Sequence, residues 1–136
     1  MRGRRVLSAD ARETAIDAFL GSLSELPILA VPSQVEEDVR ALGDAFSEDH
    51  AFASALEAIS AELGRIVADP SRGAPMQGHY AEWRRSKFQS SRSQAQPADL
   101  RIIFRRNVTL DPNGIELRVF GHRWRPTAIY LRAKGR

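Results

Sequence analysis

The sequence predicts an α+β domain in which N-terminal helices pack on one face of a small antiparallel sheet. Two observations support this fold class. Residues 9–67 carry apolar side chains at helical spacing, whereas residues 100–123 alternate apolar and arginine side chains, as strands do. At 136 residues the chain is long enough for one hydrophobic core. We therefore expect a single domain over residues 1–136, with a short first strand and helices in residues 1–72 and a basic sheet in residues 73–136.

The composition excludes several classes of protein. Hydrophobic residues make up 43% and charged residues 27% of the chain, which is typical of a soluble globular protein. Cysteine is absent, so neither a disulfide framework nor a thiolate site is possible. No apolar run approaches the length of a membrane span, and the basic N-terminus lacks the apolar segment of a signal peptide. We expect a cytoplasmic protein that does not contact membranes.

The net charge of +3 conceals an asymmetry between the two halves of the chain. Residues 7–72 hold four basic and thirteen acidic residues, whereas residues 73–136 hold thirteen basic residues, eleven of them arginine, and four acidic ones. The two halves attract each other within the fold, or the basic half binds an anion. An arginine-rich surface favours a nucleic-acid backbone, because the guanidinium fork matches phosphate oxygens.

Apolar periodicity and capping residues predict the elements of the first half. Ser8 or Asp10 is a candidate N-cap for the first helix, and Ser33 for the second, where Pro32 precedes it. Two prolines, Pro27 and Pro32, indicate a connection between these helices. The expected elements are a strand over residues 3–8 and helices over residues 9–24, from residue 33 onward and over residues 47–67.

The second half reads as three strands and a short extended or helical tail. Residues 76–88 form a candidate strand, in which Trp83 is expected to be a core residue rather than a base-stacking platform. The runs 100–106 and 115–123 flank Asp111-Pro112-Asn113-Gly114, a turn signal typical of a β-hairpin. Glu116 is expected to pair with an arginine across this hairpin.

The residue types present limit the chemistry that the chain can perform. The three histidines are not at zinc spacing, and the sequence has no glycine-rich phosphate loop, so we expect neither a metal nor a cofactor. The remaining residues suit metal-free RNA cleavage by attack of the 2′-hydroxyl on the adjacent phosphate. This reaction needs a base, an acid and cations around the developing charge. Lys87, His122 and Tyr130 are the candidates for proton transfer.

Three segments of the basic half resemble the RelE/ParE superfamily of bacterial toxin–antitoxin systems. They are residues 68–88, residues 100–106 and residues 115–130. The most specific match is Gly121-His122-Arg123 followed by Ile129-Tyr130. The resemblance implies N-terminal helices packed on a small antiparallel sheet. It also implies one of two activities: ribosome-dependent mRNA cleavage in the RelE branch, or inhibition of DNA gyrase in the ParE branch.

The same resemblance implies roles for individual residues. Arg101, Arg123 and Tyr130 fall on positions that line the active site of cleaving members, Arg85 and Lys87 assist from the preceding strand, and His122 is a further candidate acid or base. The expected RNA contacts without chemistry are Arg84, Arg92, Arg105, Arg118 and Arg125. The chain departs from the family pattern by about one additional helix, between Pro27 and Asp49, and by a longer loop over Gln89–Asp99.

Three functional hypotheses follow, and each implies its own partner. The first is an mRNA-cleaving toxin that acts on mRNA at the ribosome. The second is a gyrase-inhibiting toxin of the same fold, and the third is a nucleic-acid-binding module without catalytic activity. Either toxin would require a cognate antitoxin with an acidic segment that covers the arginine face.

Overall fold

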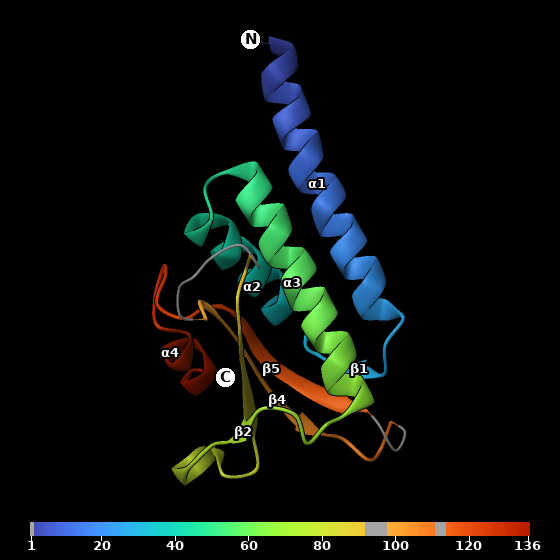
Figure 1. The fold of residues 1–136 in the computed structure, drawn as a ribbon, viewed down its shortest axis with the longest axis vertical. Helices are drawn as coiled ribbons and strands as arrows, with labels where there is room; N and C mark the ends of the chain where they lie inside the picture. The colour runs from blue at the N-terminus through green and yellow to red at the C-terminus, as the bar shows by residue number, and fades with distance from the viewer. Residues whose placement is uncertain (1, 92–97, 111–113) are drawn as a thin grey trace.

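Three helices from the first half of the chain cover one face of a five-stranded sheet, as the computed structural model of the protein shows for residues 2–91, 98–110 and 114–136 (Figure 1). This arrangement confirms the α+β fold class. The elements are α1 (Arg2–Ser24), β1 (Ile28–Leu29), α2 (Pro32–Ala45), α3 (Asp49–Ala68), β2 (Ala74–Pro75), a 3-10 turn (Gly78–Tyr80), β3 (Arg84–Phe88), β4 (Leu100–Arg106), β5 (Ile115–His122) and α4 (Ile129–Lys134). No helix among the described residues is long and apolar enough to cross a membrane.

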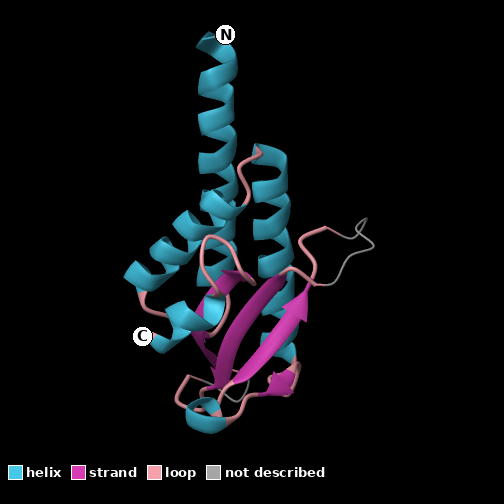
Figure 2. Cartoon of the chain, turned by 90° about the vertical axis from the view of Figure 1, so that its left-hand side faces the viewer, coloured by secondary structure: helices cyan, strands magenta, loops and turns pink. Residues whose placement is uncertain are grey.

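The sheet has the strand order β1-β5-β4-β3-β2. Its strands are the magenta arrows of Figure 2. The four strands β2 to β5 pair in antiparallel fashion, as expected from the hairpin signal. In contrast, β1 joins the edge of β5 in parallel, so the sheet is mixed rather than wholly antiparallel. The N–H of Ile115 donates to the carbonyl of Pro27 just before β1. The proline-containing connection therefore supplies the edge strand.

Alternation along the strands produces two hydrophobic clusters on opposite faces of the sheet. Ile102 and Phe104 of β4 pack in the main core with the helices, whereas Ile103 between them packs in a smaller cluster with Trp83 and Ile129. All of these side chains are buried, and each contributes roughly 1.5–3 kcal/mol of burial free energy. The smaller cluster fixes α4 on the face of the sheet that the N-terminal helices leave open.

The prediction of a first strand over residues 3–8 is wrong, because α1 begins at Arg2. Arginine and leucine are good helix formers, and no proline interrupts this segment, so the helix continues to the start of the described chain. In both views α1 lies beside α3, with its first turns projecting past the beginning of α3 (Figures 1 and 2).

The expected strand over residues 76–88 is correct only in its last part. The chain folds back on itself before that part, because Ala74 pairs with Arg85 in the register of β2 and β3, and the N–H of Met76 donates to the carbonyl of Trp83. Gly78 has a φ of 67°, a conformation that interrupts an extended run and suits the 3-10 turn in this connection.

The starts of α2 and α3 differ from expectation by one or two residues, whereas Ser8 and Asp10, the expected caps of the first helix, lie within α1. The N-cap of α2 is Val31 rather than Ser33, because Pro32 occupies the first helical turn, where its fixed φ suits the helix. The N-cap of α3 is Glu48, so this helix begins at Asp49, two residues after its expected start at residue 47.

Several features of the second half are confirmed. The strands β4 and β5 form an antiparallel pair, and Arg105 contacts Glu116 across it at 3.0 Å. The indole of Trp83 is 6% exposed, in agreement with a core position. The tail is helical and forms α4. The turn residues 111–113, on which the hairpin signal depended, lie outside the described residues.

Candidate functional site

Four side chains from four parts of the chain interact electrostatically on the face of the sheet that α4 covers, and three of them, Arg85, Arg101 and Tyr130, are joined by hydrogen bonds. They are Arg85 of β3, Arg101 of β4, Arg123 directly after β5 and Tyr130 in the first turn of α4. We refer to them as the arginine–tyrosine cluster. In the strand register Lys87 lies opposite Arg101, so the alternation of β3 places Arg85 and Lys87 on the same face.

The guanidinium groups of the cluster have donors without acceptors. Nη1 of Arg85 donates to the hydroxyl oxygen of Tyr130 at 3.3 Å. Arg101 is 2% exposed, and its Nη1 donates to the carbonyl oxygens of Ala98 and Leu100, each at 2.9 Å. The Nε atoms of Arg85 and Arg101 are buried and have no hydrogen-bond partner among the described residues. Because an unpaired buried donor is costly, these atoms favour the binding of an acceptor.

Among the described residues no carboxylate balances the positive charge of the cluster. Among the ion pairs of the described residues none involves Arg85, Arg101 or Arg123. Burial lowers the pKa of Arg101, the charges of Arg123 and Arg85 lower it further, and Tyr130 opposes this effect. Arginine nevertheless stays protonated in proteins. The cluster therefore concentrates positive charge in a poorly solvated place, which is the electrostatic character of an anion site.

The same charges act on the phenol of Tyr130. Burial alone would raise the pKa of this hydroxyl, but hydrogen bonding and positive charge from Arg85 and then from Arg101 outweigh burial and lower the pKa below 10.0. The hydroxyl oxygen accepts a hydrogen bond from Arg85, so its own proton remains available for donation. Tyr130 is thus a phenol with increased acidity beside two guanidinium groups.

A buried ion-pair network fixes α4, and with it Tyr130. Asp38 of α2 accepts hydrogen bonds from Arg136 at 2.7 Å, from Arg132 at 3.3 Å and from the backbone N–H of Phe120 at 3.2 Å. The Arg132 side chain passes close to Gly121, where an added Cβ would lie 2.7 Å from Nη2 of Arg132. Because Gly121 has no side chain, Arg132 can pass close to the backbone here and reach Asp38.

A second buried carboxylate fixes β3. Glu62 of α3, which is 1% exposed, accepts hydrogen bonds from Nε of Arg72 at 2.6 Å and from the hydroxyl of Ser86. Burial would raise the pKa of Glu62, but the hydrogen bonds from Arg72 and Ser86 outweigh this effect and lower the pKa. Ser86 lies between Arg85 and Lys87 in the strand. Its bond to the helix therefore holds the neighbouring cations on the opposite face.

The structure does not bring His122 into the cluster. Its ring lies on the helix-covered face of the sheet, 5.7 Å between centroids from Phe46. Nδ1 of His122 accepts the backbone N–H groups of Trp124 and Arg125, each at 3.0 Å. Burial and the charge of Arg125 lower the pKa of His122. A neutral imidazole thus closes the turn after β5 and has no contact with Tyr130 among the described residues.

Three of the expected RNA contacts are engaged within the protein. Arg84 donates to three carbonyl oxygens of the turn that follows α3. Arg105 forms ion pairs with Glu82 and Glu116. Arg118 stacks on aromatic rings of the smaller cluster and donates to a carbonyl of α4. These arginines stabilise the sheet and its connections.

Lys87 and Arg125 are exposed, and Arg92 lies outside the described residues. The structure adds one residue that the sequence analysis missed, Trp124, which is 62% exposed. The guanidinium carbon of Arg123 lies 4.1 Å from the centroid of its ring. The sequence contains a signal that could have identified Trp124: it lies between two arginines, and aromatic residues among cationic ones are common on nucleic-acid-binding surfaces.

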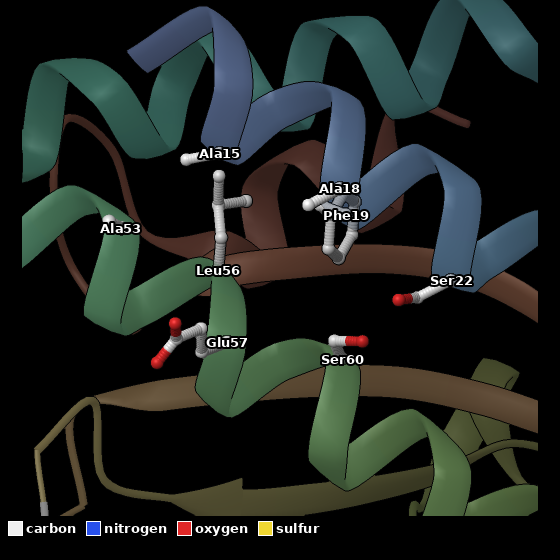
Figure 3. Close-up of a pocket in the computed structure, with 8 residues that line it drawn as sticks. All are labelled: Ala15, Ala18, Phe19, Ser22, Ala53, Leu56, Glu57 and Ser60. Carbon is white, nitrogen blue, oxygen red and sulfur yellow. The ribbon is translucent and has the colours of Figure 1, made fainter. Parts of the chain in front are cut away.

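A groove between α1 and α3 is a different kind of surface (Figure 3). It is lined by Ala15, Ala18, Phe19, Ser22, Ala53, Leu56, Glu57 and Ser60. Glu57 is the ionisable residue of this lining, so the groove offers no cation to an anionic ligand. Among the described residues no three histidine or acidic side chains are grouped as metal ligands would be.

Comparisons with protein families, with curated proteins and with solved structures gave no match.

Proposed function

We propose that the arginine–tyrosine cluster binds a phosphate of RNA and that the chain is a metal-free endoribonuclease, an mRNA-cleaving toxin of the RelE type. The observation that carries the proposal is Arg101. Its side chain is 98% buried, it has an unpaired Nε, and no carboxylate among the described residues balances its charge. Such a group is costly unless a ligand supplies the negative charge.

The neighbouring residues suit transfer of a phosphodiester to its own 2′-oxygen. In this reaction the 2′-oxygen forms a bond to phosphorus, the bond from phosphorus to the 5′-oxygen breaks, and the product carries a 2′,3′-cyclic phosphate. Arg101 and Arg85 would stabilise the negative charge that develops on the phosphate oxygens. Arginine does this at any physiological pH, and such electrostatic stabilisation is usually the largest contribution to catalysis.

The two proton transfers fall to Tyr130 and Lys87. Tyr130 would donate its proton to the leaving 5′-oxygen, because its oxygen already accepts from Arg85 and its pKa is lowered. Lys87 lies on the same face beside Arg101, and its side chain would accept the proton of the 2′-hydroxyl when it reacts as the neutral amine, which then becomes the ammonium. His122 has no part in this scheme, since its Nδ1 is occupied by two backbone donors.

The uncompensated charge also supports the partner that a toxin requires. A segment with aspartate or glutamate side chains would supply to Arg85, Arg101 and Arg123 the carboxylates that the chain itself does not provide among its described residues. We propose such a segment in a cognate antitoxin, which would inhibit the protein by occupying the phosphate site.

Cleavage of RNA, with and without ribosomes, tests the proposal. Tyr130→Phe removes the proton donor and is expected to slow cleavage about 10²- to 10⁴-fold, the usual contribution of a general acid. Lys134→Gln is the matched control, because Lys134 is an exposed cation of the same helix outside the cluster. It should cleave as fast as the wild type.

The products and the cellular phenotype separate this function from the alternatives. Detection of 2′,3′-cyclic phosphate ends supports the mechanism. Growth arrest with intact mRNA and raised DNA-damage signalling would instead identify a gyrase inhibitor. Salt-sensitive RNA binding with neither cleavage nor toxicity would identify a binding module.

A further inference from the structure

An exposed tryptophan stands next to the arginine–tyrosine cluster. Trp124 follows Arg123 directly, and the guanidinium of Arg123 lies over one face of the indole ring at 4.1 Å. Arg123 also contributes positive charge at Arg101. The charge of Arg123 thus acts on Arg101, while its guanidinium stacks on the indole of Trp124.

The indole is open to a ligand on its other side. Trp124 is 62% exposed, although one face is covered by the guanidinium. The second tryptophan, Trp83, is 6% exposed and has arginines at its ring, so it is closed to ligands. A large aromatic surface in water is unfavourable, and it usually marks an interaction site when it adjoins a charged one.

Backbone hydrogen bonds hold the loop that carries Trp124. Nδ1 of His122 accepts the N–H groups of Trp124 and Arg125. On either side, the N–H of Arg123 donates to the carbonyl of Asp99 at 2.8 Å, and the N–H of Ile129 donates to the carbonyl of Arg123 at 3.1 Å. The indole is therefore carried by an ordered turn, so little entropy is lost when a flat ligand stacks on it.

We infer that Trp124 is a stacking platform for the RNA base adjacent to the phosphate held by Arg101. The inference rests on the proposed function for the identity of the ligand. Bases stack on aromatic side chains whatever their sequence, and a guanidinium on the opposite face of the ring adds a cation–π contribution. The cluster would hold the phosphate, and Trp124 would hold the neighbouring base, whatever its identity.

The test uses a short 2′-O-methyl RNA, which cannot be cleaved because its 2′-oxygen is blocked. Trp124→Ala should weaken its binding about 5- to 150-fold, the equivalent of losing one base–aromatic stack. Trp124→Phe should restore most of the affinity, because a smaller ring still stacks. Leu131→Ala removes another exposed apolar side chain near the site and should change the affinity little.

A scan with single abasic nucleotides identifies the stacked base. In the wild type one abasic position should weaken binding by about the same factor as Trp124→Ala, and in the Trp124→Ala variant that position should have no further effect. Binding should also quench the tryptophan fluorescence of the wild type. In Trp124→Phe, where Trp83 is the remaining tryptophan, the quenching should disappear.

The outcomes distinguish the stacking platform from the proposed function. If Trp124→Ala binds as tightly as the wild type while Arg101→Met does not, the platform is overturned and the phosphate site stands. If RNA binding depends on Trp124 but RNA with free 2′-hydroxyl groups is never cleaved, the stacking role of Trp124 is supported and the proposed endoribonuclease activity is refuted. If no RNA binds to the wild type at all, both are overturned.

Discussion

Replacing Arg101 with methionine is expected to raise the free energy of unfolding and to abolish the stabilisation of the protein by inorganic phosphate. The arginine is 2% exposed and has no carboxylate partner among the described residues, so the folded state contains a largely uncompensated buried charge. Methionine has a similar length and no charge. Exchange of buried ionic groups for apolar ones of similar volume is often neutral or stabilising by about 1–4 kcal/mol.

The magnitude follows from the contacts that would be lost. The Arg101 side chain donates two hydrogen bonds to backbone carbonyls, at Ala98 and Leu100, and each contributes about 1 kcal/mol net. Desolvation of a guanidinium costs several kcal/mol. The difference predicts that Arg101→Met raises the free energy of unfolding by about 1–3 kcal/mol.

Urea unfolding with and without inorganic phosphate measures both effects. At a phosphate concentration one hundred times its dissociation constant, the wild type should gain about 2.7 kcal/mol, whereas Arg101→Met should gain nothing. Arg84→Met is the control, because Arg84 lies on the neighbouring strand β3 and donates to three backbone carbonyls of the turn that follows α3. It should lose roughly 1–3 kcal/mol of stability and keep the response to phosphate.

The reasoning is refuted if Arg101→Met unfolds more easily than the wild type by over about 1 kcal/mol and phosphate stabilises neither protein. Arg101 would then be a structural residue whose contacts with the two carbonyls outweigh the cost of burying its charge.

Two further predictions concern titration. Tyr130 should ionise at a pH below 10.0, and Arg85→Gln should raise its pKa, as followed by ultraviolet absorbance after subtraction of the Tyr130→Phe spectrum. Because the pKa of Glu62 is lowered in the folded state, its contribution to stability is present above its unfolded value of 4.5 and is lost as the pH falls through the folded value. Acid unfolding should therefore be shallower in Glu62→Gln than in the wild type.

Each titration has its own control. An unchanged phenol pKa in Arg85→Gln would show that the guanidinium does not act on Tyr130. Glu57 is an exposed carboxylate of the same helix, and Glu57→Gln should keep the acid dependence of the wild type. If the Glu62 and Glu57 variants unfold alike in acid, the buried carboxylate is not the source of the effect.

Local patterns in the sequence predicted the parts of the fold that depend on alternation. The period of two in β4 placed Ile102 and Phe104 on one face, and Arg101 and Ile103 on the other, which is the arrangement of the two clusters. The same period separates His122 from Arg123, because consecutive residues of a strand point to opposite faces. Strand alternation alone would therefore have predicted that His122 and Arg123 lie on opposite faces of the sheet. The expectation that both residues belong to one active site did not take this alternation into account.

Contacts between residues far apart in the chain could not be predicted, because they have no signature in the local sequence. The bond between Asp38 and Arg136 joins residues 98 positions apart, and an aspartate within an acidic helix looks like any solvated one. The edge strand β1 has two residues, too few for a periodicity, and its pairing with β5 depends on the packing of α1 and α2. The sequence placed Trp83 in the core, and Trp124 had a local signal in its flanking arginines, but only the structure shows that Trp124 is exposed.

The ion pair between Asp38 and Arg136 joins residues 98 positions apart and also bears on the order in which the arginine–tyrosine cluster is assembled during folding. Contacts between distant residues form late in folding, because closing a long loop costs entropy before any contact is gained. Tyr130 takes its place when α4 docks, and α4 docks through Arg132 and Arg136. During synthesis α4 and Arg136 follow the strands, so the arginines of β3 and β4 lie on an open sheet face until α4 docks. The arginine–tyrosine cluster is therefore complete only after the segment through residue 136 has been added.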